Sequence, residues 1–150
     1  MLFQNTDSSA VLQTAEKMGK RAFGWDSDMT AYGPKAHLGS AIINWGPYYV
    51  QAVREALEGK WTGNQAAWWG VKEGAIDLVS MAADVPEDTK KRVEEIKTGL
   101  KDGSFAIWKG PIVGQDGKEV LAKDAVADDK FLGGINFYVK GVEGKVPSGK

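Results

Sequence analysis

Short acidic and amide side chains follow three predicted strands of this chain, at the point where each strand ends. Asn5 and Asp7 follow the first strand, Asp26 and Asp28 follow the second, and Asn44 follows the third. In an open parallel sheet, ligands bind beyond the carboxyl ends of the strands. Short polar side chains gathered at such an edge can hydrogen-bond a small molecule. The spacing therefore predicts a small-molecule site formed by the three strand ends.

Indole rings accompany these polar groups. Trp25 and Trp45 lie beside strand ends, and the adjacent Trp68 and Trp69 would point to opposite sides of an extended chain. A flat apolar ring beside hydrogen-bonding groups is typical of a ligand site, although core filling explains tryptophans equally well. Lys72, which follows the tryptophan pair, is either a further ligand contact or part of a charged loop edge.

The Asp26-x-Asp28 pair allows a second chemistry. Two nearby carboxylates can hold a hard cation through oxygen ligands, and such a centre would support hydrolysis of a nucleoside or a sugar. The pattern is common, and no further run of metal ligands follows it. Asx-turns are the simpler explanation of both aspartates, as helix capping is for Asn5 and Asp7.

Nucleophilic catalysis has little support in the sequence. Cysteine is absent, which excludes thiol catalysis, disulfides and cysteine-ligated zinc. His37 is the only histidine, and Ser8, Ser9 and Ser27 lack the Gly-x-Ser-x-Gly surroundings of a nucleophilic serine. No phosphate-binding loop or dinucleotide-binding glycine pattern is present. The sequence favours binding over catalysis and indicates neither a cofactor nor a metal.

Composition indicates one folded domain and excludes several partners. The chain has 150 residues, of which 43% are hydrophobic, too many for a disordered protein. Nineteen basic residues balance 20 acidic ones, so a net charge of −1 gives no field that would attract nucleic acid. No apolar run reaches the roughly 18 residues of a membrane helix. The N-terminus lacks the basic and apolar regions of a signal peptide.

Hydrophobic spacing predicts alternating strands and helices over the first two thirds of the chain. Strands are predicted at residues 2–4, 21–25, 38–44 and 75–79. Helices are predicted from Val11 to Met18, from Pro47 to Glu58 with an apolar face of Val50, Val53 and Leu57, and from Pro86 to Gly103. Short connections between strand, helix and strand favour parallel pairing.

The pattern changes beyond residue 103. Residues 105–108 and 120–122 are predicted to form the two arms of a hairpin, with a turn at Asp116-Gly117. Asp128 or Asp129 is expected to cap a last helix, which carries Leu132, Ile135 and Val139.

Several segments together resemble a known family. They are Phe3-Gln4-Asn5-Thr6-Asp7-Ser8, Gly24-Trp25-Asp26-Ser27-Asp28-Met29, Ser40-Ala41-Ile42-Ile43-Asn44, Gly70-Val71-Lys72-Glu73-Gly74-Ala75 and Phe137-Tyr138-Val139-Lys140-Gly141. The Gly-x-Asp-Ser-Asp element is the most specific of them. The chain resembles the basic membrane protein family of substrate-binding lipoproteins of ABC transporters, which includes purine nucleoside receptors.

The resemblance implies an α/β fold of the type I periplasmic-binding-protein kind, with flavodoxin-like lobes in which helices flank a parallel sheet. It also implies that the chain is only the C-terminal half of such a protein, with an incomplete sheet in each lobe. Residues 1–44 would form part of the second lobe, and residues 45–84 would cross to the first lobe and back. Residues 85–150 would supply a helix, a hairpin and a terminal helix.

The function that the resemblance implies is solute binding for an ABC importer. The ligand would be a purine nucleoside or nucleobase-like molecule, bound by lobe closure without chemistry. Asp26 matches the family's aspartate that hydrogen-bonds the ligand's sugar or base, and Asn44 matches a polar residue near the hinge. The family's glycine-rich segment after the first strand is replaced here by Asn5-Thr6-Asp7-Ser8, which bears on nucleoside specificity.

The resemblance further implies a partner and a location. The partner would be an ABC permease, and the full-length protein would be periplasmic or a membrane-anchored lipoprotein. The alternative to a binding role is a truncated chain that binds nothing and self-associates through unpaired strand edges.

Overall fold

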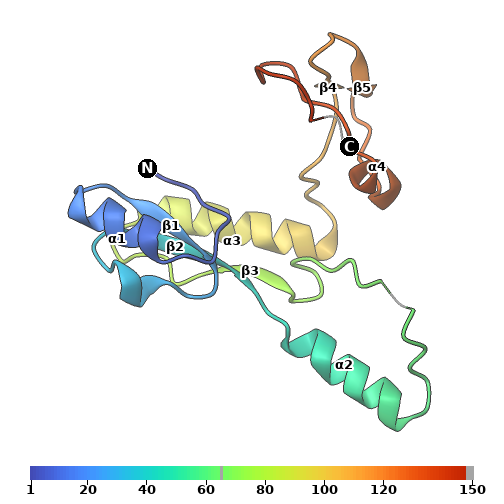
Figure 1. Cartoon of the computed structure of the whole chain (residues 1–150), viewed down its shortest axis with the longest axis horizontal. Helices are drawn as coiled ribbons and strands as arrows, with labels where there is room; N and C mark the ends of the chain where they lie inside the picture. The colour runs from blue at the N-terminus through green and yellow to red at the C-terminus, as the bar shows by residue number, and fades with distance from the viewer. Residues whose placement is uncertain (65, 148–150) are drawn as a thin grey trace. The chain divides into compact units, whose positions relative to one another are not determined.

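The computed structural model describes residues 1–64 and 66–147 (Figure 1). The chain divides into two compact units, Met1–Asp102 and Gly103–Lys150, which are described separately. The expected lobe segments 45–84 and 85–150 each include positions that lie outside the described residues.

The first unit is built on a three-stranded sheet. Its strands are β1 (Ala22–Asp26), β2 (His37–Ile43) and β3 (Ile76–Val79), in that order. β1 and β2 run parallel, and Leu2 adds a parallel bridge to Ala22. β3 runs antiparallel to β2. The chain returns from α2 to the edge at which β2 ends, where the Asn44 amide donates to the carbonyl of Ala75 at 2.7 Å, so the next strand must run in the opposite direction.

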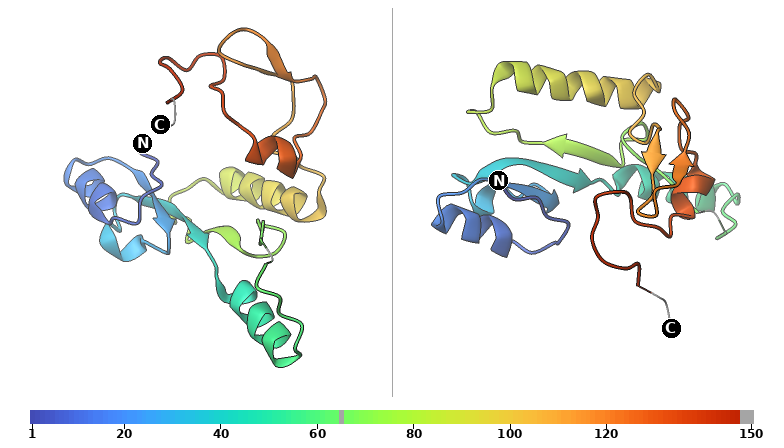
Figure 2. Two further views of the ribbon diagram at one scale, coloured as in Figure 1. Left: turned by 45° about the vertical axis from the view of Figure 1, so that its right-hand side comes forward. Right: turned by 90° about the horizontal axis from the view of Figure 1, so that it is seen from above.

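Helices cover both faces of this sheet, as Figure 2 shows for α1 and α3. α1 (Ala10–Lys17) buries Leu12 and Ala15 on the side predicted from the sequence. α3 (Glu87–Asp102) is tied to β3 by the Nζ of Lys97, which lies 2.8 Å from a carboxylate oxygen of Asp77. The predicted α/β fold with helices flanking the sheet is confirmed.

α2 (Gly46–Leu57) begins with Pro47 in its first turn, as predicted, and Gly59 follows it with φ +68°. No residue of this helix is buried. The predicted apolar face is the exposed one: Val50, Val53 and Leu57 are 58%, 59% and 85% exposed.

The second unit contains a hairpin and a short helix. β4 (Ile112–Val113) pairs antiparallel with β5 (Glu119–Leu121) around the predicted turn at Asp116-Gly117. The first arm was predicted wrongly at 105–108. The tight turn closes at once, with the Gly114 amide donating to the Lys118 carbonyl at 2.8 Å, so the partners of β5 are the residues directly before the turn.

α4 (Asp129–Gly133) has the predicted cap, because the Asp128 carboxylate accepts a hydrogen bond from the Phe131 amide at 2.7 Å. The helix is shorter than predicted. It ends at Gly133 and leaves Ile135 and Val139 outside, since consecutive glycines are poor helix formers.

The buried core of the first unit depends on a close approach between β1 and β2. Its residues are Leu12, Ala15, Ala22, Met29 and Ala36. A Cβ atom placed on Gly24 would lie 2.3 Å from the Oγ of Ser40 and 2.8 Å from the Cβ of Met29. Only glycine leaves room for both neighbours.

We expect Gly24→Ala to lower the free energy of unfolding by about 1–3 kcal/mol, because the added methyl group must displace buried neighbours. Urea unfolding followed by far-UV circular dichroism measures this loss. Gly70→Ala is the matched control, since a Cβ there meets no atom within 4 Å. Equal stabilities of the two variants would contradict the close contact.

Candidate ligand-binding site

The candidate site begins at one edge of the sheet. Because the segment at Leu2, β1 and β2 run in the same direction, their carboxyl ends share this edge. The structure therefore places Asp26, at the end of β1, and Asn44, after β2, at one edge of the sheet. Asn5 and Asp7 lie in the loop that follows the single bridge of Leu2 to Ala22. Neighbouring strands lie roughly 4.8 Å apart, so one small molecule can reach adjacent strand ends.

Asp26 is the most distinctive residue of this edge. Its backbone has φ +72°, a left-handed conformation that few residues other than glycine adopt. Its side chain is half-buried, and the carboxylate neither accepts a hydrogen bond from nor forms an ion pair with any residue that the structure describes. A strained residue with an unused charge is a candidate for function.

Asn44 has a structural role at the same edge. Its Oδ1 accepts from the Gly46 amide at 3.1 Å and its Nδ2 donates to the Gly74 carbonyl at 3.2 Å. An amide carries two N–H donors, so one hydrogen remains for a ligand. Asn44 thus joins the start of α2 to the segment before β3 and keeps one donor free for binding.

The loop before α1 is exposed. Ser8, and not Asn5 or Asp7, accepts the amide of Ala10 at the start of the helix, at 3.2 Å. Helix capping therefore does not account for Asn5 and Asp7, and both remain available at the edge.

Asp28, unlike Asp26, has hydrogen-bond partners of its own. Its Oδ1 accepts from the amide of Thr30 at 3.0 Å and from the Thr30 hydroxyl, and its Oδ2 accepts from the hydroxyl of Ser80 at 2.5 Å. The hydrogen bond from Ser80, followed by those from Thr30, lowers the pKa of Asp28 to about 2. Both oxygens are therefore occupied.

Among the described residues, the two aspartates are not part of a larger cluster of metal-ligating side chains. Over residues 1–64 and 66–147, no group of three or more histidine, cysteine, aspartate or glutamate side chains is arranged to hold a metal ion.

His37 lies inside the first unit. It is 2% exposed, and its Nε2 lies 2.8 Å from the Oγ of Ser40, which is fully buried. The same Oγ accepts the amide of Met29 at 3.0 Å. A serine nucleophile must be reachable by substrate, so this pair is a structural contact.

Burial lowers the pKa of His37 below its usual value of 6.5; the charge of Asp28 opposes this shift and that of Arg21 adds to it. We therefore expect the imidazole to titrate below pH 6.5. Between its folded pKa and 6.5 the unfolded chain binds more protons, so stability falls as the pH drops through this window.

The chain has one histidine, so its imidazole signals in a ¹H–¹³C NMR titration are unambiguous. The same titration in urea gives the unfolded reference. A folded midpoint at or above the unfolded one would contradict the burial of His37.

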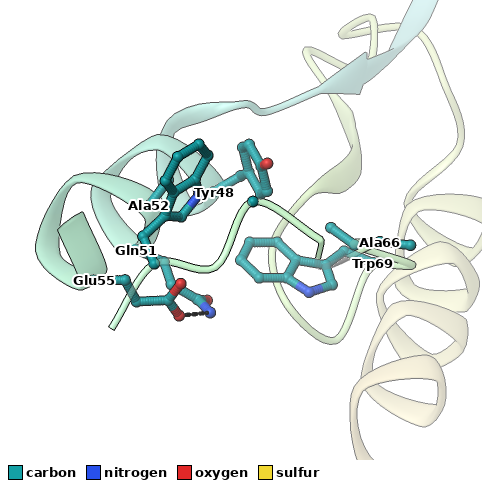
Figure 3. Close-up of a pocket in the computed structure, with 9 residues that line it drawn as sticks. Tyr48, Gln51, Ala52, Glu55, Ala66 and Trp69 are labelled. Atoms are coloured by element: carbon teal, nitrogen blue, oxygen red, sulfur yellow. Dashed lines mark hydrogen bonds between the residues drawn. The ribbon is translucent and has the colours of Figure 1, made fainter. Parts of the chain in front are cut away.

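An aromatic hollow lies between α2 and the segment that follows it. Figure 3 shows the ring of Tyr48 facing the indole of Trp69, with centroids 5.8 Å apart in an edge-on arrangement. On the same helix, Gln51 donates to Glu55 at 2.7 Å. The hollow has a volume of about 120 Å³ and also involves Trp61, which is below the roughly 300–1,000 Å³ of ordinary ligand pockets.

A second hollow of about 450 Å³ joins the aromatic residues to the sheet edge. It is lined by Asn44 and Trp45 together with Tyr48 and Trp69. Trp45 also stacks on Tyr49, with ring centroids 6.1 Å apart. Polar and aromatic groups thus meet beside the end of β2, as expected of a site for a flat polar molecule.

Tyr48, Gln51, Glu55 and Trp61 were not identified from the sequence. Residues 48, 52 and 55 follow helical spacing and share one face of α2. In the sequence, the aliphatic residues of the opposite face give the stronger hydrophobic signal and mask this one.

The other candidates are not brought to these hollows. Trp25 is half-buried in β1, where it pairs with Ala41. Trp68 is 67% exposed, whereas its neighbour Trp69 is half-buried, so the two differ in burial as an extended chain predicts. Lys72 is exposed in the turn before β3.

Comparison with known proteins identifies the family. The sequence pattern of PnrA-like ABC transporter substrate-binding proteins matches residues 1–105. The chain belongs to this family. The family resemblance that the sequence motifs indicate is therefore confirmed.

Two curated relatives are similar over nearly the whole PnrA-like chain. A purine-binding protein of Brucella abortus is 41% identical over 147 residues, which are 98% of this chain and 41% of the relative. A candidate ABC transporter glucose-binding protein of Haloferax volcanii is 25% identical over 99% of this chain and 35% of its own length. The chain therefore spans about two fifths of the relatives it matches.

Solved structures share the fold of this PnrA-like chain. A transcriptional activator of the comK gene from Bacillus halodurans has a TM-score of 0.60 at 17% identity, over 69% of this chain and 37% of that protein. An ABC transporter solute-binding protein from Conexibacter woesei has a TM-score of 0.52 at 18% identity, over 71% and 36%. None of the helices in the described residues has the length and apolar content to cross a membrane.

Proposed function

We propose that this chain is part of the solute-binding component of an ABC importer and that it recognises a purine nucleoside or a nucleobase-like small molecule. The observation that carries the proposal is the carboxylate of Asp26, which pairs with no residue that the structure describes and is held in a left-handed backbone at the sheet edge. The 41% identity to a purine-binding protein supports a purine as the ligand.

The proposed contacts divide between hydrogen bonding and stacking. Asp26 accepts hydrogen bonds from ligand N–H or O–H groups, and Asn44 donates its remaining N–H. The rings of Trp45, Tyr48 and Trp69 form an apolar wall for a flat ring. Asn5, Asp7, Trp25, Asp28, Trp68 and Lys72 remain secondary candidates, of which Asn5 and Asp7 are placed best.

We propose that the protein performs no chemistry on its ligand. The buried Ser40 and His37 are occupied with each other, and the oxygens of Asp28 are occupied by Thr30 and Ser80. Binding by lobe closure needs only that the ligand contact the closed state better than the open one.

The proposed arrangement assigns residues 1–44 to the second lobe, residues 45–84 to a crossing into the first lobe and back, and the described part of 85–150 to the C-terminal region. α2 falls in the crossing, and its exposed apolar face is consistent with a place in another lobe. The proposed partner is an ABC permease, and the proposed location is the periplasm or a membrane-anchored lipoprotein.

A chimera tests the proposed ligand. In it, this chain replaces the matching segment of the Brucella abortus relative, and calorimetry measures binding of adenine, adenosine and guanosine. We expect at least one to bind, and Asp26→Asn to weaken that binding by about tenfold or more, because a hydrogen bond to a charged group contributes about 1.5–3 kcal/mol.

Asp88→Asn is the matched control, since it removes an exposed carboxylate at the start of α3. Wild-type binding that is unaffected by Asp26→Asn would overturn the assigned contact. Failure of the folded chimera to bind any of the three compounds would overturn the proposed ligand class, and release of free base from a nucleoside would favour the hydrolase.

The chain by itself is expected to bind these compounds weakly or not at all, and to self-associate through open strand edges. Calorimetry and sedimentation equilibrium of the 150-residue chain check the two expectations. Micromolar binding by a stable monomer would contradict both.

A further inference from the structure

One buried hydroxyl, that of Ser40 in β2, holds the connection between β1 and β2 by a hydrogen bond. Residues 27–36 make this connection, with a single 3-10 turn at Thr30–Tyr32. The amide of Met29 donates to the Oγ of Ser40 at 3.0 Å, and Met29 is 3% exposed. Met29 lies three residues beyond Asp26, so this anchor fixes the turn that Asp26 begins.

The hydrogen bonds around His37 determine which tautomer its neutral imidazole adopts. The Ser40 oxygen already accepts the Met29 amide, so its own hydrogen is free to go to the Nε2 of His37 at 2.8 Å. The Thr30 hydroxyl gives its hydrogen to Asp28, so Nδ1 can only donate to it, and in the neutral imidazole Nε2 is then the acceptor of the Ser40 hydrogen. Nδ1 faces the hydroxyl of Thr30 at 3.4 Å.

The hydrogen bonds continue from His37 through Thr30 and Asp28 to Ser80. The Thr30 hydroxyl donates to Asp28, and Ser80, which follows β3, donates to the other oxygen of Asp28. A second proton on His37 would remove the acceptor of the Ser40 hydroxyl and place a charge where almost no water reaches. The Ser40 oxygen can still accept the Met29 amide in that state, but the lost acceptor of its own hydrogen and the buried charge weaken the packing around this contact.

We propose that His37 and Ser40 are positioning residues of the ligand site, which hold the β1–β2 loop so that Asp26 presents its carboxylate at the sheet edge. The proposal rests on the proposed function only for the role of Asp26; the anchor itself is a property of the chain without ligand. Protonation of His37 in acid weakens the anchor and loosens the loop.

Several charged groups act on His37 from the elements around it. Asp28 from the loop favours protonation, and Arg21, whose guanidinium donates to the His37 carbonyl at 3.1 Å, opposes it. Three more charges lie nearby. Asp84 pairs with Arg21, Lys35 lines a hollow together with Arg21 and His37, and Glu16 of α1 accepts a hydrogen bond from the Lys35 backbone amide. The pH at which His37 titrates therefore depends on all of these charged groups.

Hydrogen–deuterium exchange of the Met29 amide tests the anchor in the ligand-free chain. We expect Ser40→Ala to speed this exchange by about tenfold, because a buried amide loses its acceptor. The control Thr98→Ala removes an exposed hydroxyl from α3 and is expected to leave the rate unchanged. In the wild type, exchange corrected for its intrinsic pH dependence is expected to accelerate in step with the NMR titration of His37.

His37→Gln separates positioning from simple packing. Its side-chain amide oxygen can accept the Ser40 hydrogen, so we expect slow exchange at neutral pH without the acceleration in acid. Wild-type exchange that does not change across the His37 titration would overturn the proposal, and this measurement needs no variant to fold. The same result from His37→Gln as from wild type would also overturn it.

Asp26→Asn distinguishes this proposal from the proposed function. It is expected to leave Met29 exchange unchanged in the chain while it weakens ligand binding in the chimera. An intact anchor with no ligand binding would contradict the function alone. Unchanged exchange in a folded Ser40→Ala variant would contradict the anchor alone.

Discussion

Two neighbouring parallel strands must be joined by a chain that returns to the edge where the first strand began, and between β1 and β2 residues 27–36 make this return. Such crossovers ordinarily take about a dozen residues or more and contain a helix. Here one 3-10 turn fits, so side chains hold the connection in place. Ser40 anchors Met29, and the Nε of Arg21 donates to the carbonyl of Ala36 at 3.3 Å. The absence of a side chain at Gly24 lets Ser40 and Met29 come close enough to meet.

The same connection explains why Asp26 and Asp28, separated by one residue, differ in their hydrogen-bond partners. Asp26 stands where the strand ends, and its left-handed backbone turns the chain back beneath the sheet. Asp28 is already on the returning chain, where Thr30 and Ser80 occupy both its oxygens. The carboxylate of Asp26 therefore has no partner among the described residues, and that of Asp28 stabilises the loop that follows Asp26.

α2 and the segment after it contribute the apolar part of the site. The helix buries no residue, and its aliphatic face is exposed while its aromatic face lines the two hollows. An isolated helix of this length is marginal in water, so the contact between Tyr48 and Trp69 and the tie of Asn44 to Gly74 matter for its position.

The sequence by itself determined the features that depend on near neighbours along the chain. Helix and strand positions follow from hydrophobic spacing, and the turn at Asp116-Gly117 and the cap at Asp128 follow from local hydrogen bonding. The common edge of Asp26 and Asn44 follows from parallel pairing. Tertiary structure decided what depends on distant partners. The hairpin arm at 112–113 depended on where the turn closes, and the direction of β3 on where the chain re-enters the sheet. Asp28 meets Ser80, 52 positions away, and no local pattern encodes that distance. The burial of His37 and the contact between Tyr48 and Trp69 likewise depend on residues that lie far apart in the sequence.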